Sequence, residues 1–505
     1  MPNSEAFVKA INQSYAIQSS SIYLGAGILE GSICADASVH IPLRMMNRHG
    51  LIAGATGSGK TRTLQVLAEQ LSAAGVPVFM SDIKGDLSGL AKALEPDDRI
   101  RQRASALQID YRPADYPVEL YSLSGEIGAQ MRATVTEMGP NLLGKILQLN
   151  DTQVGVLAVL FKYADDKKLP VVDLADLKKV LSYLSEGVGK EEIKDSYGSI
   201  SSSTATTILR KIVALEQQGV GKVFGEKSFD IEDLLERVDG RGVISLLNVS
   251  DMQSSPAVYS TFLLGMLAEL YQKLPEAGDL DKPKLVFFLD EAHLLFNEAP
   301  KVFLEQVEQV IRLIRSKGVG IFFCTQMAQD IPASVLSQLG NRIQHVLRVF
   351  TPNDSKALKE TVQTYPRSSF YDIGEQLTKL GIGQALVTVL NEKGIPTEVV
   401  ATHLTPPTAS MGPLPTDDYQ SRVRNSTSFA RYSTAYDPES AHEILARKMD
   451  SAQNEEDKDS SRNESGRRGA DKSMLEDVMS SPVAKQIGRE LVRGLFGMFF
   501  GSKRR

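Results

Sequence analysis

The sequence predicts an α/β fold with a mostly parallel central sheet, and three observations lead to this prediction. Residues 49–54 are a short apolar run, residues 60–74 follow it with helical spacing, and residues 76–81 form a second apolar run. A strand, a helix and a strand at this spacing make a βαβ unit, in which the two strands are parallel. Apolar runs alternate with helical patterns again after residue 240. Residues 285–289 are wholly apolar, as is typical of a strand buried on both faces.

The composition fits a chain with a large buried core. With 505 residues, of which 42% are hydrophobic and 23% charged, the sequence is long enough for about two to four globular domains. Cys34 and Cys324 lack the spacing of a zinc site or a disulfide framework, so a reducing compartment is expected. No signal pattern and no run of about 18 apolar residues occurs, so we expect a cytoplasmic protein without a spanning helix. The net charge of −6 gives no overall sign of nucleic-acid binding, so any such surface must be local.

The first half of the chain divides into three segments. Residues 1–48 are too short for an independent domain and are expected to form a short β segment, with edge strands at 21–24 and 39–43. Residues 49–125 are the first part of the core. Residues 126–239 carry apolar residues at helical intervals and few strand signals, which predicts a helical insert within the core.

The second part of the core is expected over residues 240–405. Strand patterns alternate there with two helical patterns. The expected strands are residues 242–249, 284–289, 319–325, 345–349 and 384–390, and the expected helices are residues 258–274 and 302–317.

The composition shifts after about residue 405. Four prolines stand in a polar run, and residues 450–473 have almost no apolar content, so residues 406–480 are expected to be a linker with disorder. Residues 481–505 regain apolar residues at helical spacing with basic residues opposite them, which predicts an amphipathic C-terminal helix. This helix either packs on its own protein, docks on a protein partner or, as the weakest alternative, lies on a membrane surface.

A glycine-rich segment between the first strand and the first helix fits the pattern GxxxxGK[ST] in full. Successive backbone N–H groups in such a loop wrap a phosphate, and the helix that follows directs the positive end of its dipole at it. The segment therefore predicts that the protein binds ATP and Mg²⁺, with Lys60 reaching the β- and γ-phosphates and the Thr61 hydroxyl ligating the metal. A chance glycine turn is the alternative, which the flanking strand and helix disfavour. The residues of the loop are Gly54, Ala55, Thr56, Gly57, Ser58, Gly59, Lys60 and Thr61.

Two acids follow the most apolar strand pattern, and ligands bind at the carboxyl ends of parallel strands. Asp290 is expected to hold Mg²⁺ through water, and Glu291 to polarise the water that attacks the γ-phosphate. The alternatives are a helix cap for Asp290 and a solvated acid for Glu291. The acids and the loop must face one triphosphate across neighbouring strands. Together they predict a RecA-like (ASCE) P-loop NTPase that hydrolyses ATP. No NKxD element follows the core strands, so guanine specificity is not supported.

Further polar residues are candidates for the same reaction. Gln326 ends the strand pattern after the acidic one and is expected to sense the γ-phosphate, with a strand-end cap as the alternative. An arginine, often from a neighbouring subunit, stabilises the developing charge in such reactions. Arg315 is the first candidate and Arg48 another, although either residue alone is more often a surface or ion-pair residue. Asp82 ends the second core strand, where a nucleotide contact and a plain turn cap are equally supported.

Five segments of the sequence together resemble the HerA branch of the HerA/FtsK superfamily, and in particular its bacterial helicase HerA-like subgroup. The segments are NRHGLIAGATGSGKT, FMSDIKGDLSGLA, LVFFLDEAHLLF, RSKGVGIFFCTQ and GNRIQHVLR. The resemblance covers roughly residues 20–405. It implies a RecA-like ATPase that assembles as a ring, typically a hexamer, with active sites between subunits and with DNA translocation as the activity. The residues that match the family's nucleotide loop, acidic pair, polar sensor and two arginines are Lys60, Thr61, Asp290, Glu291, Gln326, Arg315 and Arg48.

The sequence also departs from this family, and two functions remain open. HerA proper carries an N-terminal β-barrel domain, whereas this chain has 53 residues before its phosphate loop. The first hypothesis is a ring-forming ATP-driven motor that acts on DNA, which the motifs favour. The alternative is an ATP-dependent assembly switch or scaffold without translocation, which the net acidity favours slightly.

Overall fold

The computed structural model describes residues 4–186, 188–194, 196–252, 255–296, 301–434, 436 and 438–462. They form two compact units. The first unit comprises the described residues up to Met131 together with Phe229–Ser433. The second comprises Arg132–Ser228 together with the described residues from Thr434 onward. Among the described helices, none combines the length and apolar content needed to cross a bilayer.

The first unit is built on a twelve-stranded sheet among its described residues, in the order β2-β1-β14-β13-β12-β3-β11-β10-β4-β9-β5-β6. Neighbouring strands are parallel from β12 to β6 and antiparallel from β12 to β2. The strands are β1 (Ser21–Leu29), β2 (Ser32–Pro42), β3 (Gly50–Ala53), β4 (Val78–Asp82), β5 (Val118–Ser122), β6 (Ala129–Gln130), β9 (Ile244–Asn248), β10 (Leu285–Leu289), β11 (Val319–Thr325), β12 (Asn341–Gln344), β13 (Gln384–Thr388) and β14 (Val400–Leu404); β7 (Arg237–Val238) and β8 (Arg241–Gly242) form a small separate pair. The predicted α/β class with a mostly parallel sheet is confirmed.

Helices connect the strands of this sheet. The apolar side of α2 buries Leu64, Leu67 and Leu71 in the same core as Val78 of β4 and Val286 of β10. The helices of the first unit are α1 (Ser4–Ser14), α2 (Lys60–Ala73), α3 (Asp98–Ala106), α9 (Pro256–Lys273), α10 (His293–Phe296), α11 (Lys301–Ile314), α12 (Ala333–Leu336), α13 (Pro352–Gln363), α14 (Ile373–Lys379), α15 (Thr416–Asn425) and α16 (Thr427–Tyr432), with short 3₁₀ turns such as η1 (Leu43–Arg48) and η6 (Arg315–Lys317).

The N-terminal residues belong to the main sheet and also form a helix that the sequence did not lead us to expect. The hairpin β1–β2 pairs with β14, so it extends the antiparallel wing of the sheet. Helix α1 packs on this wing through Phe7 and Ile11, which are fully buried. The Phe7 ring meets the Phe370 ring edge-on at a centroid distance of 5.1 Å. A single helix of this length buries only one narrow stripe, which is a weak signal in sequence.

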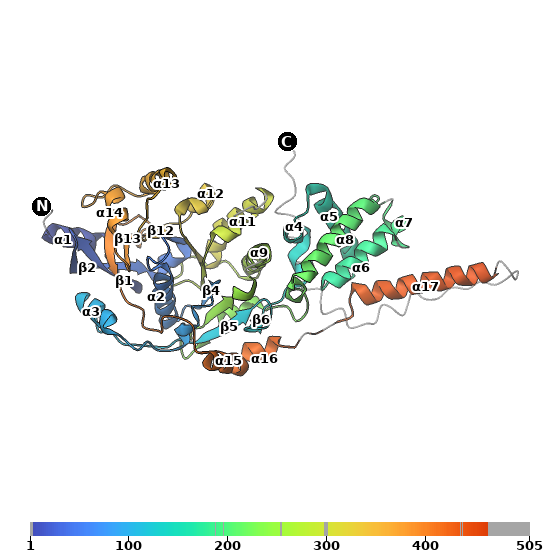
Figure 1. Ribbon diagram of the computed structural model, residues 1–505, viewed down its shortest axis with the longest axis horizontal. Helices are drawn as coiled ribbons and strands as arrows, with labels where there is room; N and C mark the ends of the chain where they lie inside the picture. The colour runs from blue at the N-terminus through green and yellow to red at the C-terminus, as the bar shows by residue number, and fades with distance from the viewer. Residues whose placement is uncertain are drawn as a thin grey trace. The chain divides into compact units, whose positions relative to one another are not determined.

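The second unit is helical among its described residues. Its helices are α4 (Val135–Ile146), α5 (Asp151–Asp166), α6 (Leu174–Ser185), α7 (Gly189–Lys194), α8 (Ser202–Gln217) and α17 (Ala441–Arg462). Figure 1 shows α5, α6 and α8 side by side. Helix α17 begins where the buried Asp176 carboxylate accepts hydrogen bonds from Ser440 Oγ at 2.5 Å and from the His442 N–H at 2.8 Å. The unit therefore combines Arg132–Ser228 with residues that come more than 200 positions later in the chain.

The prediction of a linker over residues 406–480 is wrong for the residues of this range that the structure describes, 406–434, 436 and 438–462. The proline-rich stretch is held against α2, because the Glu69 carboxylate accepts hydrogen bonds from the N–H groups of Thr408 at 2.8 Å and Ala409 at 3.0 Å. Three helices, α15 to α17, follow it. The low apolar content is a misleading signal, because buried polar contacts fix the stretch together with a few buried apolar residues such as Ala409 and Leu414. Residues 463–480 and the predicted helix at 481–505 lie outside the described residues.

A further prediction about strands is wrong. The strand expected at 345–349 lies four residues earlier, as β12, and the strand expected at 384–390 is followed by a strand that the pattern does not predict, β14. Strand β12 contains the fully buried Asn341, whose amide donates to the carbonyls of Met45 and His49 at 3.0 Å each. Buried polar residues of this kind interrupt the apolar pattern from which strands are predicted.

Candidate nucleotide-binding and hydrolysis site

The phosphate loop connects the end of β3 to the start of α2. Gly54, Gly57 and Gly59 have φ angles of 149°, 75° and 113°, a region that residues with a side chain rarely adopt. A Cβ atom at Gly54 would lie 2.5 Å from the Cβ of His345, so this glycine is also required by close packing. The Lys60 Nζ folds over the loop and donates to the carbonyls of Gly54 at 2.7 Å and Ala55 at 3.2 Å. The loop thus has the backbone form that the motif predicts.

Strand β11 lies between the strand of the phosphate loop and the strand of the acids. In the register of the sheet, Phe323 of β11 pairs with Leu51 of β3 on one side and with Leu289 of β10 on the other. The expectation that loop and acids lie on neighbouring strands is therefore wrong by one strand. All three strands are parallel and end at the same edge of the sheet, so the site residues that follow them share that edge.

Asp290 follows β10 and is 6% exposed. Its N–H donates to Ser81 Oγ at 2.9 Å, and its Oδ1 accepts from the N–H of Glu291 at 2.9 Å. Burial, followed by the neighbouring Glu291 charge, raises the pKa of Asp290. A cation at this carboxylate would relieve both effects, as expected of a metal ligand.

Glu291 has a left-handed backbone, with a φ of 46°. Its Oε1 lies 3.2 Å from Lys84 Nζ, and its Oε2 lies 3.4 Å from His293 Nδ1. The side chain is 14% exposed, so the solvated-acid alternative does not describe it. Lys84 follows Asp82 at the end of β4, at the end of the sheet where the sequence predicts the nucleotide, but its ion pair with Glu291 is not evident from the sequence.

Asp82 ends β4 and holds the turn that presents Lys84. Its Oδ1 accepts from the N–H groups of Gly85 at 2.7 Å and Asp86 at 3.1 Å, and its Oδ2 accepts from the N–H of Leu87 at 3.0 Å. Burial raises the pKa of Asp82 to about 6, although the backbone donors oppose this shift. These bonds match the turn-cap alternative.

His345 packs against the phosphate loop and the first turn of α2. The sequence does not predict this role, because His345 reads there as an ordinary strand residue. It is fully buried, and its Nε2 lies 2.9 Å from Thr63 Oγ1. Burial, together with the Lys60 charge, lowers the pKa of His345 to about 4, so the ring is neutral at pH 7. The backbone N–H donates to Ala53 at 2.7 Å. His345 therefore fixes both the end of β3 and the first turn of α2.

The polar sensor candidate lies at the same edge as the loop, but the two arginine candidates do not. Gln326 follows β11, is exposed, and its carbonyl accepts from the N–H of Gly54 at 3.2 Å. Arg48 and Arg315 precede β3 and β11, so they lie at the opposite edge of the sheet. There they line a pocket of about 360 Å³ together with Arg44 and Arg312. Within one subunit, the arginines and the phosphate loop are not brought together.

The residues at the loop edge fit ATP and Mg²⁺. Ser58 Oγ is buried and, within the described part of the chain, has no hydrogen-bond partner, so the loop has a polar atom to offer a phosphate. Thr61 and Asp290 supply oxygen ligands, which Mg²⁺ prefers. The described residues hold no cluster of three or more His, Cys, Asp or Glu suited to a metal. Mg²⁺ bound with nucleotide needs none, because phosphates and waters complete its shell.

Comparison with known proteins identifies the family to which the chain belongs. A family model described as "Helicase HerA-like C-terminal" matches residues 29–505. The chain belongs to this family. The DNA double-strand break repair helicase HerA of Sulfurisphaera tokodaii is 25% identical to this HerA-like chain over 380 residues, covering 70% of this chain and 65% of the relative. The protein of the same name from Saccharolobus solfataricus is 23% identical over 371 residues, covering 73% of this chain and 67% of the relative. The HerA-like chain thus spans about two thirds of the length of these relatives.

Solved structures confirm the fold. The ΔN70 form of the bacterial conjugative coupling protein TrwB matches the HerA-like chain with a TM-score of 0.52 and 11% identity, covering 80% of this chain and 93% of that chain. Its complex with a non-hydrolysable ATP analogue gives a TM-score of 0.51 and 13% identity, covering 80% and 92%. At these identities the likeness shows the fold alone, which is the predicted RecA-like P-loop fold.

Proposed function

We propose that the protein is an ATP-hydrolysing motor of the HerA type that works as a ring, and that its substrate is DNA. The observation that carries the ATPase part is the strand order β3-β11-β10, which brings the phosphate loop, Gln326 and the two acids to one edge of the sheet. MgATP bound there would supply the electrophilic γ-phosphoryl group and part of the charge neutralisation.

The roles of the residues follow from their positions. Lys60 and the loop N–H groups hold the phosphates, and Thr61 and Asp290 hold the metal. Glu291 accepts a hydrogen bond from the attacking water and so orients and polarises it. Gln326, which ends the strand between loop and acids, positions the γ-phosphate or the same water. These four roles use side chains that the described structure gathers at one edge.

The arginine pocket supports a site shared between subunits. Arg48 and Arg315 lie at the edge opposite their own phosphate loop, so they reach a phosphate only when that edge faces the loop of another copy. A head-to-tail contact of this kind closes into a ring when the rotation between subunits permits. The family resemblance makes a hexamer the natural size. Arginines supplied in this way act on the charge that develops at the γ-phosphate.

The DNA part of the proposal rests on the family, since both relatives above are DNA double-strand break repair helicases. The test is the rate of ATP hydrolysis with and without double-stranded DNA at low salt, where phosphate contacts are strongest. Stimulation that is lost on raising the salt supports a DNA motor. A slow rate of ATP hydrolysis that is the same with and without DNA supports the assembly switch, which the net charge of −6 slightly favours. The Lys60→Ala variant measures the background rate.

A further inference from the structure

Lys84 reaches Glu291 from the side of β10 that lies away from the phosphate loop. Leu289, at the end of β10, pairs with Ser81 of β4 on one side and with Phe323 of β11 on the other. Lys84 follows β4, whereas the loop follows β3, which lies beyond β11. Neighbouring strands are about 4.8 Å apart, so β3 lies about 10 Å from β10 on the side opposite to Lys84. The ion pair therefore draws the Glu291 carboxylate away from the loop.

The backbone of Glu291 is fixed, so only its side chain is free to change direction. Its N–H donates to Asp290 Oδ1 at 2.9 Å, and its carbonyl accepts from the N–H of Leu294 at 2.9 Å. The next N–H, that of Ala292, donates to the carbonyl of Cys324 at 2.8 Å. Moving this backbone would break three hydrogen bonds, whereas the side chain needs only a change of rotamer to leave Lys84.

The turn that carries Lys84 is held as firmly as the backbone of Glu291. The Asp82 carboxylate accepts hydrogen bonds from three successive backbone N–H groups, those of Gly85, Asp86 and Leu87. Gly85 has a φ of 74°, which glycine adopts without strain. The Lys84 side chain itself is 50% exposed. The ion pair thus joins two fixed backbones, and water is accessible to the ammonium when the pair breaks.

Lys84 binds only one of the two oxygens of the Glu291 carboxylate. Oε1 lies 3.2 Å from Lys84 Nζ. Oε2 is buried, lies 3.4 Å from His293 Nδ1 and forms no hydrogen bond within the described residues. A buried carboxylate oxygen without a donor is costly, so a water molecule that donates to it stabilises the side chain. The arrangement held by Lys84 is therefore one that a bound water would improve.

The ammonium of Lys84 is charged and has other acids near it. Burial acts to lower the pKa of Lys84, but the hydrogen bond with Glu291 and the charges of Asp290, Glu291 and Asp86 raise it overall. A metal cation held by Asp290 would repel this ammonium and weaken its hold on Glu291. Asp86, in the same turn, offers Lys84 another acid as partner. The pair can therefore break without leaving the ammonium far from a negative charge.

We propose that Lys84 restrains Glu291, because the ion pair holds the carboxylate on the β4 side and competes with the arrangement in which Glu291 activates water. Lys84 is thus a positioning residue, since it acts through Glu291 and touches no reacting atom. An ion pair of this exposure favours the restrained arrangement by a factor of about two to five. The proposal rests on the role of Glu291 given under Proposed function.

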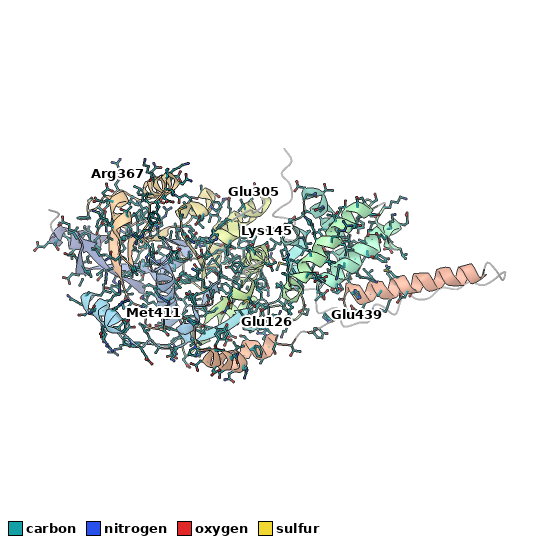
Figure 2. All side chains as sticks on the ribbon, in the orientation of Figure 1. Glu126, Lys145, Glu305, Arg367, Met411 and Glu439 are labelled. Atoms are coloured by element: carbon teal, nitrogen blue, oxygen red, sulfur yellow. The ribbon has the colours of Figure 1, made fainter. Side chains whose placement is uncertain are left out.

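The first test is the rate of ATP hydrolysis by the full chain without DNA. Lys84→Met removes the charge and nearly keeps the length of the side chain, so we expect the rate to rise about two- to fivefold. Lys84→Arg keeps a cation beside Glu291, so its rate should stay below that of Lys84→Met. Arg367→Met is the matched control, because Arg367, labelled in Figure 2, is an exposed cation in the loop after α13. An unchanged melting temperature shows that the variants fold.

The second test needs no hydrolysis. A double-mutant cycle of Lys84→Met and Glu291→Gln measures the ion pair by urea denaturation of the protein without nucleotide or metal. We expect the two changes to be coupled by about two- to fivefold in the unfolding equilibrium constant at low salt. The coupling should shrink at high salt, which screens a partly exposed pair. Additive effects of the two changes would show that the pair contributes nothing and would overturn the restraint.

The outcomes separate this proposal from the proposed function. A slower Lys84→Met variant would mean that Lys84 assists Glu291, and an unchanged rate would mean that it neither assists nor restrains. Either result refutes the restraint while the ATPase stands. An equal rise in rate on adding Lys84→Met to Glu291→Gln would also refute it, because the effect would not act through Glu291. If the wild type neither binds nor hydrolyses ATP, the proposed function itself fails and the restraint fails with it.

Discussion

At the scale of single residues, the site residues are held in place by neighbouring side chains that are not themselves expected to react. Glu291 is positioned by a left-handed backbone and by Lys84, 3.2 Å from its carboxylate. Thr63, in the first turn of α2, joins the helix after the loop to the buried His345. The motif predicted Gly54–Thr61, Asp290 and Glu291, because phosphate chemistry dictates those residue types at those spacings. It could not predict the contacts of Lys84 and His345, because their partners lie more than 200 positions away in the chain.

Replacing Glu291 by glutamine should stop turnover and preserve binding. The amide keeps the size of the side chain but cannot accept the proton or polarise the water as a carboxylate does. We expect the rate of ATP hydrolysis to fall by about 100-fold or more, with the dissociation constant of ATP within a few-fold of the wild-type value. Steady-state hydrolysis and calorimetric titration of the same preparation measure both quantities. A variant that keeps a tenth of the wild-type rate would show that Glu291 is not the residue that activates water.

Replacing Thr63 by valine should destabilise the protein at the start of α2. The change keeps the volume but leaves the buried Nε2 of His345 without its partner at 2.9 Å. We expect the free energy of unfolding to fall by about 1–3 kcal/mol, measured by urea denaturation. Thr378→Val is the control, because Thr378 is exposed and bonds only within its own helix, to the Glu375 carbonyl. Equal effects at both positions would mean that the contact with His345 contributes nothing.

At the scale of elements, the proline-containing segment 405–414 shows where sequence patterns stop being informative. Most of the parallel core could be predicted, because strands such as β10 and β11 are almost continuous apolar runs. Segment 405–414 lacks such an apolar pattern. It is ordered by the Glu69 carboxylate and by the Gln65 amide, which donates to the carbonyls of Ala409 at 3.0 Å and Ser410 at 3.1 Å. Contacts between α2 and a segment over 330 positions later are set by tertiary structure, so no local rule could reveal them.

The stability of the protein should carry a pH dependence from Glu69. Burial raises the pKa of Glu69 from 4.5 to about 7, against the opposing effect of its hydrogen-bond donors. The folded state therefore binds this proton more tightly than the unfolded chain, so the contribution of Glu69 is greatest below pH 4.5 and is lost as the pH rises towards 7.

Glu69→Gln removes this titration. We expect the stability of the variant, relative to wild type, to increase by about 2–3 kcal/mol between pH 5 and pH 8, measured by urea denaturation at both values. The difference between the two proteins at a fixed pH also contains the change of side chain, so only its change with pH tests the argument. If the difference is the same at pH 5 and pH 8, Glu69 does not bind its proton more tightly in the folded state.

At the scale of the whole molecule, the residues at the carboxyl ends of the parallel strands differ in kind from the residues at their amino ends. The carboxyl ends of β3, β11 and β10 lead into the loop, Gln326 and the acids, whereas the residues before β3 and β11 form the arginine pocket. The resemblance suggested arginines at Arg48 and Arg315, but only the register of the strands shows that they lie at the edge away from their own loop. Under the proposed function, a complete site therefore forms only where two subunits meet.

Mixing two inactive variants should therefore restore activity. Lys60→Ala lacks a working loop, and Arg315→Ala lacks an arginine. In a random one-to-one mixture, about a quarter of head-to-tail contacts join an intact loop to an intact arginine. We expect ATP hydrolysis to recover to about that fraction of the wild-type rate after subunits exchange. No recovery, with mixed rings shown by mass spectrometry, would mean that Arg315 does not serve the site of its neighbour.

If the arginines serve the site of a neighbouring subunit as proposed, the opposed edges also determine which assemblies can be active. A twofold contact centred on the loop edge joins loop to loop, and one centred on the arginine edge joins arginine to arginine, so neither contact completes a catalytic centre. Successive copies that all point the same way complete one centre at every junction, and closure into a circle leaves no junction unused. Turnover per chain should thus vanish on dilution below the concentration at which circles form, even while each chain stays folded, because a lone subunit holds two unlike halves of a centre that it cannot bring together.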